Sequence, residues 1–136
     1  MAYVIKAEIR DAGKRIFEFT AQKTMYGGKR IAVGDQVFLF ASENEGGSGL
    51  VARGIVTRAE AVPKAADLAR QTPRVSVTVE RKSRSSRPLG RAELKPFSEW
   101  SDRRPETELN FKLYRQATNK IVGISGAATE FLERLF

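Results

Sequence analysis

Residues 34–60, GDQVFLFASENEGGSGLVARGIVTRAE, constrain the fold more than any other stretch of this chain. Residues 37–40 are apolar and rich in aromatic and branched side chains, but the run is too short for a helix, so it predicts a strand. A second strand is predicted over residues 50–56, in which Gly54 indicates a β-bulge or a close approach of two backbones. The polar residues 42–49 between the strands can bury little. Two apolar strands around a polar loop are typical of a sheet that presents a binding loop.

The rest of the chain is rich in short strands. Residues 3–10 alternate between apolar and polar side chains, which predicts a half-buried strand and a hairpin with the next strand, residues 15–20. Further strands are predicted at residues 74–82 and 121–124, while residues 21–33 and 101–108 are expected to be irregular. Helical segments are predicted at residues 64–71, within 91–100, at 110–117 as a helix or turn, and at 126–136 after the N-cap Ser125. This order predicts a single α+β domain, residues 1–136, with a small curved β-sheet or pseudo-barrel and short peripheral helices.

The chain contains no histidine and no cysteine, and this excludes several kinds of site. Histidine is the usual general base near neutral pH, and both residues are the usual zinc ligands. Zinc sites, disulfides and nucleophiles of the Ser-His or Cys-His type are therefore not expected, and we predict neither a metal nor a cofactor. No apolar run approaches the roughly 20 residues that a membrane span needs. The amino-terminal residues do not resemble a secretory signal, so we expect a cytoplasmic protein.

The chain is strongly basic, with 24 Lys and Arg against 16 Asp and Glu, a formal net charge of +8. Nucleic acid is the first candidate for a polyanionic partner, and the alternative is a basic surface that serves only solubility. Residues 74–91 hold six basic side chains and one acid, and further cations flank Gly27 and Gly28. Such segments either contact phosphate or are merely solvated. The residues that we select for phosphate contact are Lys23, Lys29, Arg84, Arg87 and Arg115.

Four pieces of the sequence resemble the PUA-like superfamily, and most closely its EVE branch, with the ASCH and YTH branches as relatives. They are the opening strand YVIKAEI, the segment GDQVFLFAS with LVARGIVTRA, the aromatic region FSEW…LNFKLYRQATNKIVGIS, and a short terminal helix. The resemblance implies a small barrel-like sheet with a pocket that can receive a nucleobase, because EVE and YTH domains use such a pocket to read modified bases. A three-aromatic cage like that of the YTH branch is not assigned residue by residue here.

The residue types that such a pocket needs are present. A base outside a duplex is held by stacking on aromatic faces and by hydrogen bonds to its edge. Trp100 is the strongest candidate wall, since it is the sole tryptophan and lies between polar segments, although it could equally be an amphipathic packing residue. Phe40 could also stack, but its apolar strand favours a place in the core. The remaining candidates for the base pocket are Phe97, Tyr26, Tyr114, Ser42, Asn44, Asn110 and Gln116, and the loop at residues 42–49 is expected to be a mobile gate or an edge contact.

The favoured function is a non-catalytic nucleic-acid-binding module that reads a single base, including a modified one. One alternative is an ASCH-like hydrolase of modified nucleosides, in which Lys23, Thr24 and Glu43 would act, because a buried lysine with a lowered pKa can serve as a base. Another is a module that binds a small molecule or a protein. The sequence leaves open DNA or RNA, the identity of the base, and the oligomeric state.

Overall fold

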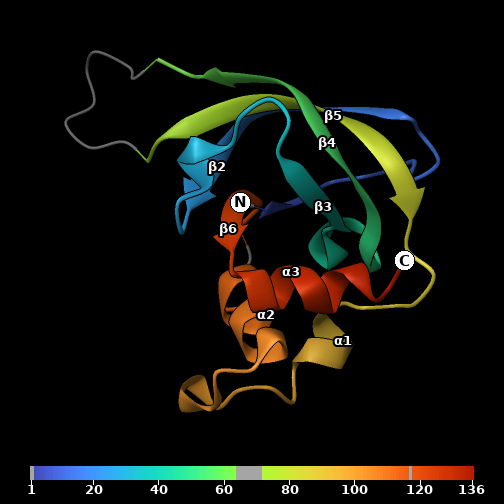
Figure 1. Ribbon diagram of the computed structural model, residues 1–136, viewed down its shortest axis with the longest axis vertical. Helices are drawn as coiled ribbons and strands as arrows, with labels where there is room; N and C mark the ends of the chain where they lie inside the picture. Colours follow the sequence, from blue (N-terminus) through green and yellow to red (C-terminus); the bar gives the residue numbers. More distant parts are fainter. Residues whose placement is uncertain (1, 64–71, 117) are drawn as a thin grey trace.

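The computed structural model describes residues 2–63, 72–116 and 118–136, and within them six strands form a closed barrel. The strands are β1 (Ala2–Ala7), β2 (Ile16–Met25), β3 (Gln36–Ala41), β4 (Gly49–Ala61), β5 (Arg74–Arg84) and β6 (Lys120–Ile124), in the spatial order β1-β3-β4-β5-β2-β6. The helices α1 (Arg91–Leu94), α2 (Pro105–Leu113) and α3 (Gly126–Glu133) gather on one side, while β4 and β5 arch over the other (Figure 1). Three 3-10 helices complete the described part: η1 (Gly28–Arg30), η2 (Glu43–Glu45) and η3 (Trp100–Asp102). The predicted pseudo-barrel with peripheral short helices is confirmed.

β1 is buried along its whole length, and this corrects the prediction of a half-buried strand. Tyr3 and Ile5 belong to the apolar cluster that also holds the inward residues of β2, β4 and β5. Val4, on the other face, packs in a second cluster with Leu109, Leu113 and other residues of the helices. Alternation correctly identified the inner face. It placed Val4 and Lys6 in water because it could not anticipate that helices distant in sequence cover the outer face.

The predicted hairpin between residues 3–10 and 15–20 is wrong. β1 pairs in parallel with β3 and antiparallel with β6, whereas β2 pairs antiparallel with β5 and in parallel with β6. A strand that is buried on both faces lies inside a sheet, here between β3 and β6, while the barrel interior and the helices cover its two faces.

β2 also runs further than predicted, through part of the segment that we expected to be irregular. The pairing with β5 shifts register between Phe19 and Gln22, and Ala21 lies there with a φ of 49°. The Ala21 N–H donates to Ser76 Oγ (2.8 Å). This bulge breaks the alternation of side chains, which explains why the pattern hid the second half of the strand.

β3 and β4 form the antiparallel pair predicted from residues 34–60. Phe40 is fully buried, which confirms its place in the core. The register of β4 and β5 shifts between Arg53 and Gly54, as the bulge prediction required. A Cβ at Gly54 would lie 2.3 Å from the Glu80 carbonyl oxygen, so this glycine permits a close approach of two backbones.

The helices agree with the sequence in part. Ser125 caps α3 by accepting a hydrogen bond from the Ala128 N–H (3.1 Å), as predicted. Residues 105–108, predicted to be loop, form the first turn of α2, because Pro105 fits the first helical position, where an N–H has no partner to lose. The helix predicted at residues 64–71 lies outside the described residues. None of the described helices is long and apolar enough to cross a membrane.

Gly54→Ala should lower the free energy of unfolding by about 1–3 kcal/mol, because β4 and β5 must separate to admit the methyl group. Urea denaturation measures this change. The matched control is Gly126→Ala, where an added Cβ meets nothing within 4 Å and the helix gains a better helix former. Equal stability of the Gly54→Ala variant and the wild type would contradict the close approach.

Candidate functional site

An aromatic pocket of about 360 Å³ lies between the end of β2 and α2. Its walls include Tyr26, Trp100 and Phe111, and we call it the Tyr26–Trp100 pocket. Its other lining residues are Arg103, Arg104, Thr107, Glu108, Lys112 and Ser125. The volume falls at the lower end of the range of small-ligand sites. Two residues that the sequence named for stacking, Tyr26 and Trp100, are thus brought together from distant parts of the chain.

The aromatic rings of the pocket are unusually open to solvent. Trp100 is 70% exposed and Tyr26 is 50% exposed. The Trp100 and Phe111 rings pack in a T-shaped arrangement, with 4.9 Å between the centroids and 61° between the planes. The Lys112 ammonium lies 5.2 Å from the centroid of the Tyr26 ring. A tryptophan that is largely exposed leaves ring surface on which a planar ligand can stack.

Backbone strain is concentrated at the pocket. Among the described non-glycine residues, positive φ occurs at Ala21, Tyr26 and Arg103, and the last two line the pocket, with φ of 51° and 57°. Side chains with a Cβ adopt this left-handed conformation at a cost of order 1 kcal/mol, and such residues tend to cluster at ligand sites. The strained backbone and the exposed rings therefore both indicate a ligand site at this pocket.

The polar floor of the pocket is built on Glu108. Its carboxylate accepts hydrogen bonds from the Ser125 N–H (2.8 Å), the Ser125 hydroxyl and the Lys112 ammonium (3.1 Å). Burial alone would raise the pKa of Glu108, but the hydrogen bonds from Ser125 and Lys112 lower it below the usual value. Glu108 is therefore ionised at neutral pH and joins α2 to the start of α3.

A second polar cluster lies at the other end of α2, around η2. Glu43 accepts from the Tyr114 hydroxyl (3.0 Å) and from the Arg91 N–H (2.7 Å). The Arg91 guanidinium donates to Asn44 Oδ1 (3.0 Å), and Asn119 Nδ2 donates to Glu45 Oε1 (2.6 Å). The loop that was expected to be a mobile gate or an edge contact is tied to the start of α1, to the end of α2 and to the residue before β6. Its two glutamates serve these internal contacts.

Two lysines are buried beneath this cluster. Lys6 and Lys120 face each other across β1 and β6, and each is at most 1% exposed. Lys6 Nζ donates to the Leu113 carbonyl (2.9 Å) and Lys120 Nζ to the Gln116 carbonyl (3.0 Å), so both cations lie at the carboxyl end of α2, where the helix dipole favours them. Burial lowers the pKa of both, and with the repulsion of Lys6 it brings that of Lys120 to about 8. Sequence reasoning missed both, because a lysine in a strand normally indicates an exposed face.

The remaining base-pocket candidates do not join Tyr26 and Trp100. Ser42 is 1% exposed, and its hydroxyl has no hydrogen-bond partner within the described residues, so it is not presented to a ligand. Asn110 donates to the Phe97 carbonyl (3.0 Å), a structural contact between α2 and the segment before it. Tyr114 is held by Glu43, and burial together with that carboxylate raises the pKa of its hydroxyl.

Asn110, Tyr114 and Arg115 line a neighbouring hollow of about 330 Å³. Phe111 lines both this hollow and the Tyr26–Trp100 pocket. The Arg115 guanidinium lies 5.1 Å from the centroid of the Phe111 ring. Gln116, a further edge candidate, is exposed, and its carbonyl accepts from Lys120.

The residues selected for phosphate contact are spread over the fold. Lys29, Arg84 and Arg87 are exposed on η1, at the end of β5 and in the following loop, and Lys23 is half-buried in β2. None of the selected residues is among the described residues that line the Tyr26–Trp100 pocket. The cations found there are Arg103, Arg104 and Lys112, which sequence reasoning missed. Arg103 and Arg104 lie in the charged segment that follows Trp100, which was expected to be irregular, and Lys112 lies in the segment expected to be a helix or turn.

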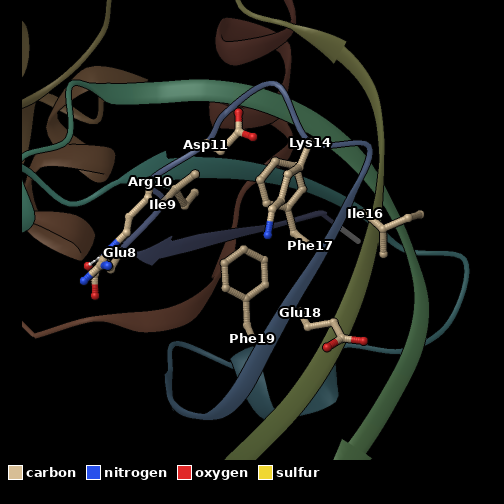
Figure 2. A pocket seen from close by; sticks show the side chains of 9 residues that line it. All are labelled: Glu8, Ile9, Arg10, Asp11, Lys14, Ile16, Phe17, Glu18 and Phe19. Carbon is tan, nitrogen blue, oxygen red and sulfur yellow. Dashed lines mark hydrogen bonds and ion pairs between the residues drawn. The ribbon is translucent and has the colours of Figure 1, made fainter.

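A larger hollow of about 630 Å³ opens at the mouth of the barrel (Figure 2). The rings of Phe17 and Phe19 lie side by side in it, nearly parallel, with 6.2 Å between their centroids, and the ion pair of Glu8 and Arg10 (2.6 Å) borders it. Its lining also includes Asp11, Lys14 and Glu18, so acids outnumber bases. No residue that the sequence analysis selected for base or phosphate contact is among the described residues that line this barrel-mouth hollow.

The residues of the hydrolase alternative make separate contacts. The Thr24 hydroxyl donates to the Pro73 carbonyl (2.8 Å), and Glu43 is bound to Tyr114 and Arg91. Within the described residues no hydrogen bond joins Lys23, Thr24 and Glu43. In that part of the chain, no group of three or more acidic side chains could hold a metal ion.

The fold is similar to several solved structures that share little sequence with this chain. The DUF55 domain of human thymocyte nuclear protein 1 is 13% identical, with a TM-score of 0.65, and the match covers 99% of this chain and 98% of that one. Human THYN1 protein in complex with 5-methylcytosine-containing DNA is 15% identical, with a TM-score of 0.65 and coverage of 98% and 96%. A hypothetical protein from Leishmania major is 20% identical, with a TM-score of 0.60 and coverage of 98% and 92%. No protein-family model and no curated protein matches the chain. The likeness confirms the PUA-like pseudo-barrel fold with peripheral helices that the sequence resemblance implied.

The buried lysines predict an unusual pH dependence of stability. The pKa of Lys120 is lowered to about 8 in the folded state, so between about pH 8 and pH 10.5 the unfolded chain binds the proton that the folded chain has released. Stability attributable to this group therefore rises with pH across that window. At pH 7 the free energy of unfolding of Lys120→Met, measured by urea denaturation, should be about 1–3 kcal/mol higher than that of the wild type. The difference should shrink by pH 10. A difference in unfolding free energy between the variant and the wild type that stays constant from pH 7 to pH 10 would contradict the burial of a charged Lys120.

Proposed function

We propose that this protein is a non-catalytic nucleic-acid-binding module that holds one unpaired base, including a modified one, in the Tyr26–Trp100 pocket. The observation that carries the proposal is the combination of exposed aromatic walls with three cationic lining residues, Arg103, Arg104 and Lys112. Aromatic stacking supplies affinity for the face of any base, and positive charge beside it supplies affinity for the backbone.

Stacking on Trp100 is the largest single contribution that we expect. A base stacked on an aromatic side chain is worth about 1–3 kcal/mol, and this energy depends little on base identity. Because the Trp100 ring already packs against Phe111, the ring needs little ordering when the base arrives. Tyr26 supplies the second aromatic surface of the pocket, and its strained backbone is consistent with a residue retained for binding.

Electrostatics favour the same ligand. The net charge of +8 attracts a polyanion over long range, and a phosphate next to the stacked base would meet Arg103 or Arg104. Within the described residues neither guanidinium has a hydrogen bond or an ion pair, so binding a phosphate breaks no internal contact. Arginine suits this contact because its planar fork pairs with two phosphate oxygens.

The comparison with human THYN1 supports the class of partner. That protein shares the fold at 15% identity and was solved with 5-methylcytosine-containing DNA. At this identity the likeness supports nucleic acid as the partner, while the pocket must be argued from the residues of this chain. The Glu43 and Glu108 carboxylates both accept hydrogen bonds from other residues of the chain, so neither is free to act as a general base. This favours binding over catalysis.

The barrel-mouth hollow is the second candidate place for the base, because it is larger and contains the Phe17 and Phe19 rings. Those rings are only 6% exposed, and the charged residues around them include three acids that would repel a phosphate. We therefore assign the base to the Tyr26–Trp100 pocket.

Trp100→Ala should weaken binding of a short single-stranded DNA by about 5- to 100-fold, and Trp100→Phe should retain most of the affinity, since stacking contributes about 1–3 kcal/mol per base. Fluorescence anisotropy of a labelled oligonucleotide at low salt measures this. Arg10→Ala, at the barrel mouth, is the control and should change affinity little. Undetectable binding by the wild-type protein would refute the function, and loss of binding in Arg10→Ala but not in Trp100→Ala would move the base to the barrel mouth.

Arg104→Gln should lower the salt dependence of binding, because each phosphate contact releases about one counterion and changes the slope of log K against log salt by about 0.9. Titrations between 50 and 200 mM salt, about the range in which such slopes are measured, give this value. An unchanged slope in Arg104→Gln would show that this arginine does not contact phosphate.

A further inference from the structure

We infer that the Tyr26–Trp100 pocket selects guanine, or a base with the same pair of adjacent acceptors, through the free donors of its lining. The inference rests on the proposed function and adds the chemical class of base. It follows from which hydrogen-bonding groups of the pocket are already occupied.

The acceptors on the α3 side of the pocket are occupied. One Glu108 oxygen accepts from the Ser125 N–H and from Lys112, and the other accepts from the Ser125 hydroxyl. The Ser125 hydroxyl oxygen in turn accepts from the Ala128 N–H (3.1 Å). The nearby Gly123 carbonyl accepts from Lys112 (2.7 Å). The amino group of an incoming base would have to share an acceptor that these donors already use.

On the η3 side the Asp102 carboxylate already takes two hydrogen bonds, and the Thr107 hydroxyl is buried. Asp102 accepts from the Arg104 N–H and from the Thr107 hydroxyl, each at 3.0 Å. These contacts lower the pKa of the Asp102 carboxyl, so it stays ionised and bonded to them. Thr107 keeps lone pairs, but it is 2% exposed and cannot present them to a ligand.

Donors, by contrast, are in surplus. The Arg103 and Arg104 guanidiniums make no hydrogen bond or ion pair within the described residues, and each carries five N–H groups. Lys112 uses two of its three N–H groups, on Glu108 and Gly123. Tyr26 is an exposed lining residue, and its hydroxyl can both donate and accept.

Guanine is the base that matches this set. Its O6 and N7 are adjacent acceptors, and an arginine fork bonds to both at once. Adenine N6 and cytosine N4 are donors on the corresponding edge, and in this pocket they would meet cations or occupied acceptors. An amino group that loses water without gaining an acceptor lowers affinity. The free arginines therefore serve the base edge as well as the backbone.

The test uses short single-stranded DNA in which abasic sites flank one central base, so that only one base can enter the pocket. The central base is guanine, inosine, 7-deazaguanine, adenine, cytosine or thymine. Quenching of Trp100, the sole tryptophan, reports stacking, and anisotropy reports affinity. Guanine and inosine should bind alike, because both have O6 and N7. 7-Deazaguanine, adenine and cytosine should bind about 5- to 100-fold more weakly, the range expected for one bidentate pair.

Variants identify the donor. Arg103→Gln or Arg104→Gln should reduce the preference for guanine over 7-deazaguanine to about twofold or less, since the fork is lost. Arg134→Gln, an exposed arginine at the far end of α3 from Ser125, is the matched control and should keep the preference. Tyr26→Phe should also keep it, and loss of the preference in Tyr26→Phe alone would show that the tyrosine hydroxyl makes the selection and overturn the arginine assignment.

The outcomes separate the two proposals. Salt-sensitive binding with Trp100 quenching, but with 7-deazaguanine equal to guanine or with cytosine or adenine bound more tightly, overturns the guanine inference and leaves the proposed function standing. The absence of any binding or quenching overturns both.

Discussion

The complete burial of β1 is the constraint on which the rest of the structure depends. One face of the strand fills the barrel, and the other must be covered by helices, because Val4 and Lys6 lie on it. A buried ammonium requires partners, and the carboxyl end of α2 supplies a carbonyl to Lys6 and an aromatic face from Tyr114, 4.7 Å away. The position of α2 over the sheet is thus fixed at one end by the charge that β1 carries beneath it.

The other end of α2 is fixed by a different contact, and this places the pocket. Glu108 is bonded to Ser125 at the start of α3, so the helix cannot tilt away from β6. With both ends held, Phe111 and Lys112 face the end of β2, where Tyr26 lies, and Trp100 closes the space from η3. The aromatic pocket is therefore a consequence of how the second apolar layer is anchored to the barrel, and the three cations line it because they belong to α2 and the turn before it.

The sequence predicted most of the fold and part of the site, and the failures have physical causes. Local patterns identified the β3–β4 pair, the bulge at Gly54 and the cap at Ser125, because each depends on a few neighbouring residues. The partners of β1 and the continuation of β2 depend on contacts between distant segments and on a bulge at Ala21, which leave no local pattern. The sequence named Tyr26 and Trp100 as stacking candidates by residue type alone, and only the structure brings them together in one pocket. Arg103, Arg104 and Lys112 were missed because a charged side chain beside a pocket and one in bulk water look alike in sequence.

The topology of the barrel also dictates when it can form. β1 pairs with β6, so strands near opposite ends of the chain must meet before the barrel closes. Contacts of such long sequence separation are reached only after a large loss of chain entropy, which slows folding. During synthesis β1 waits with one backbone edge unpaired until residues 120–124 have emerged. Until then this strand, rich in apolar side chains, has an edge that can pair wrongly with another strand.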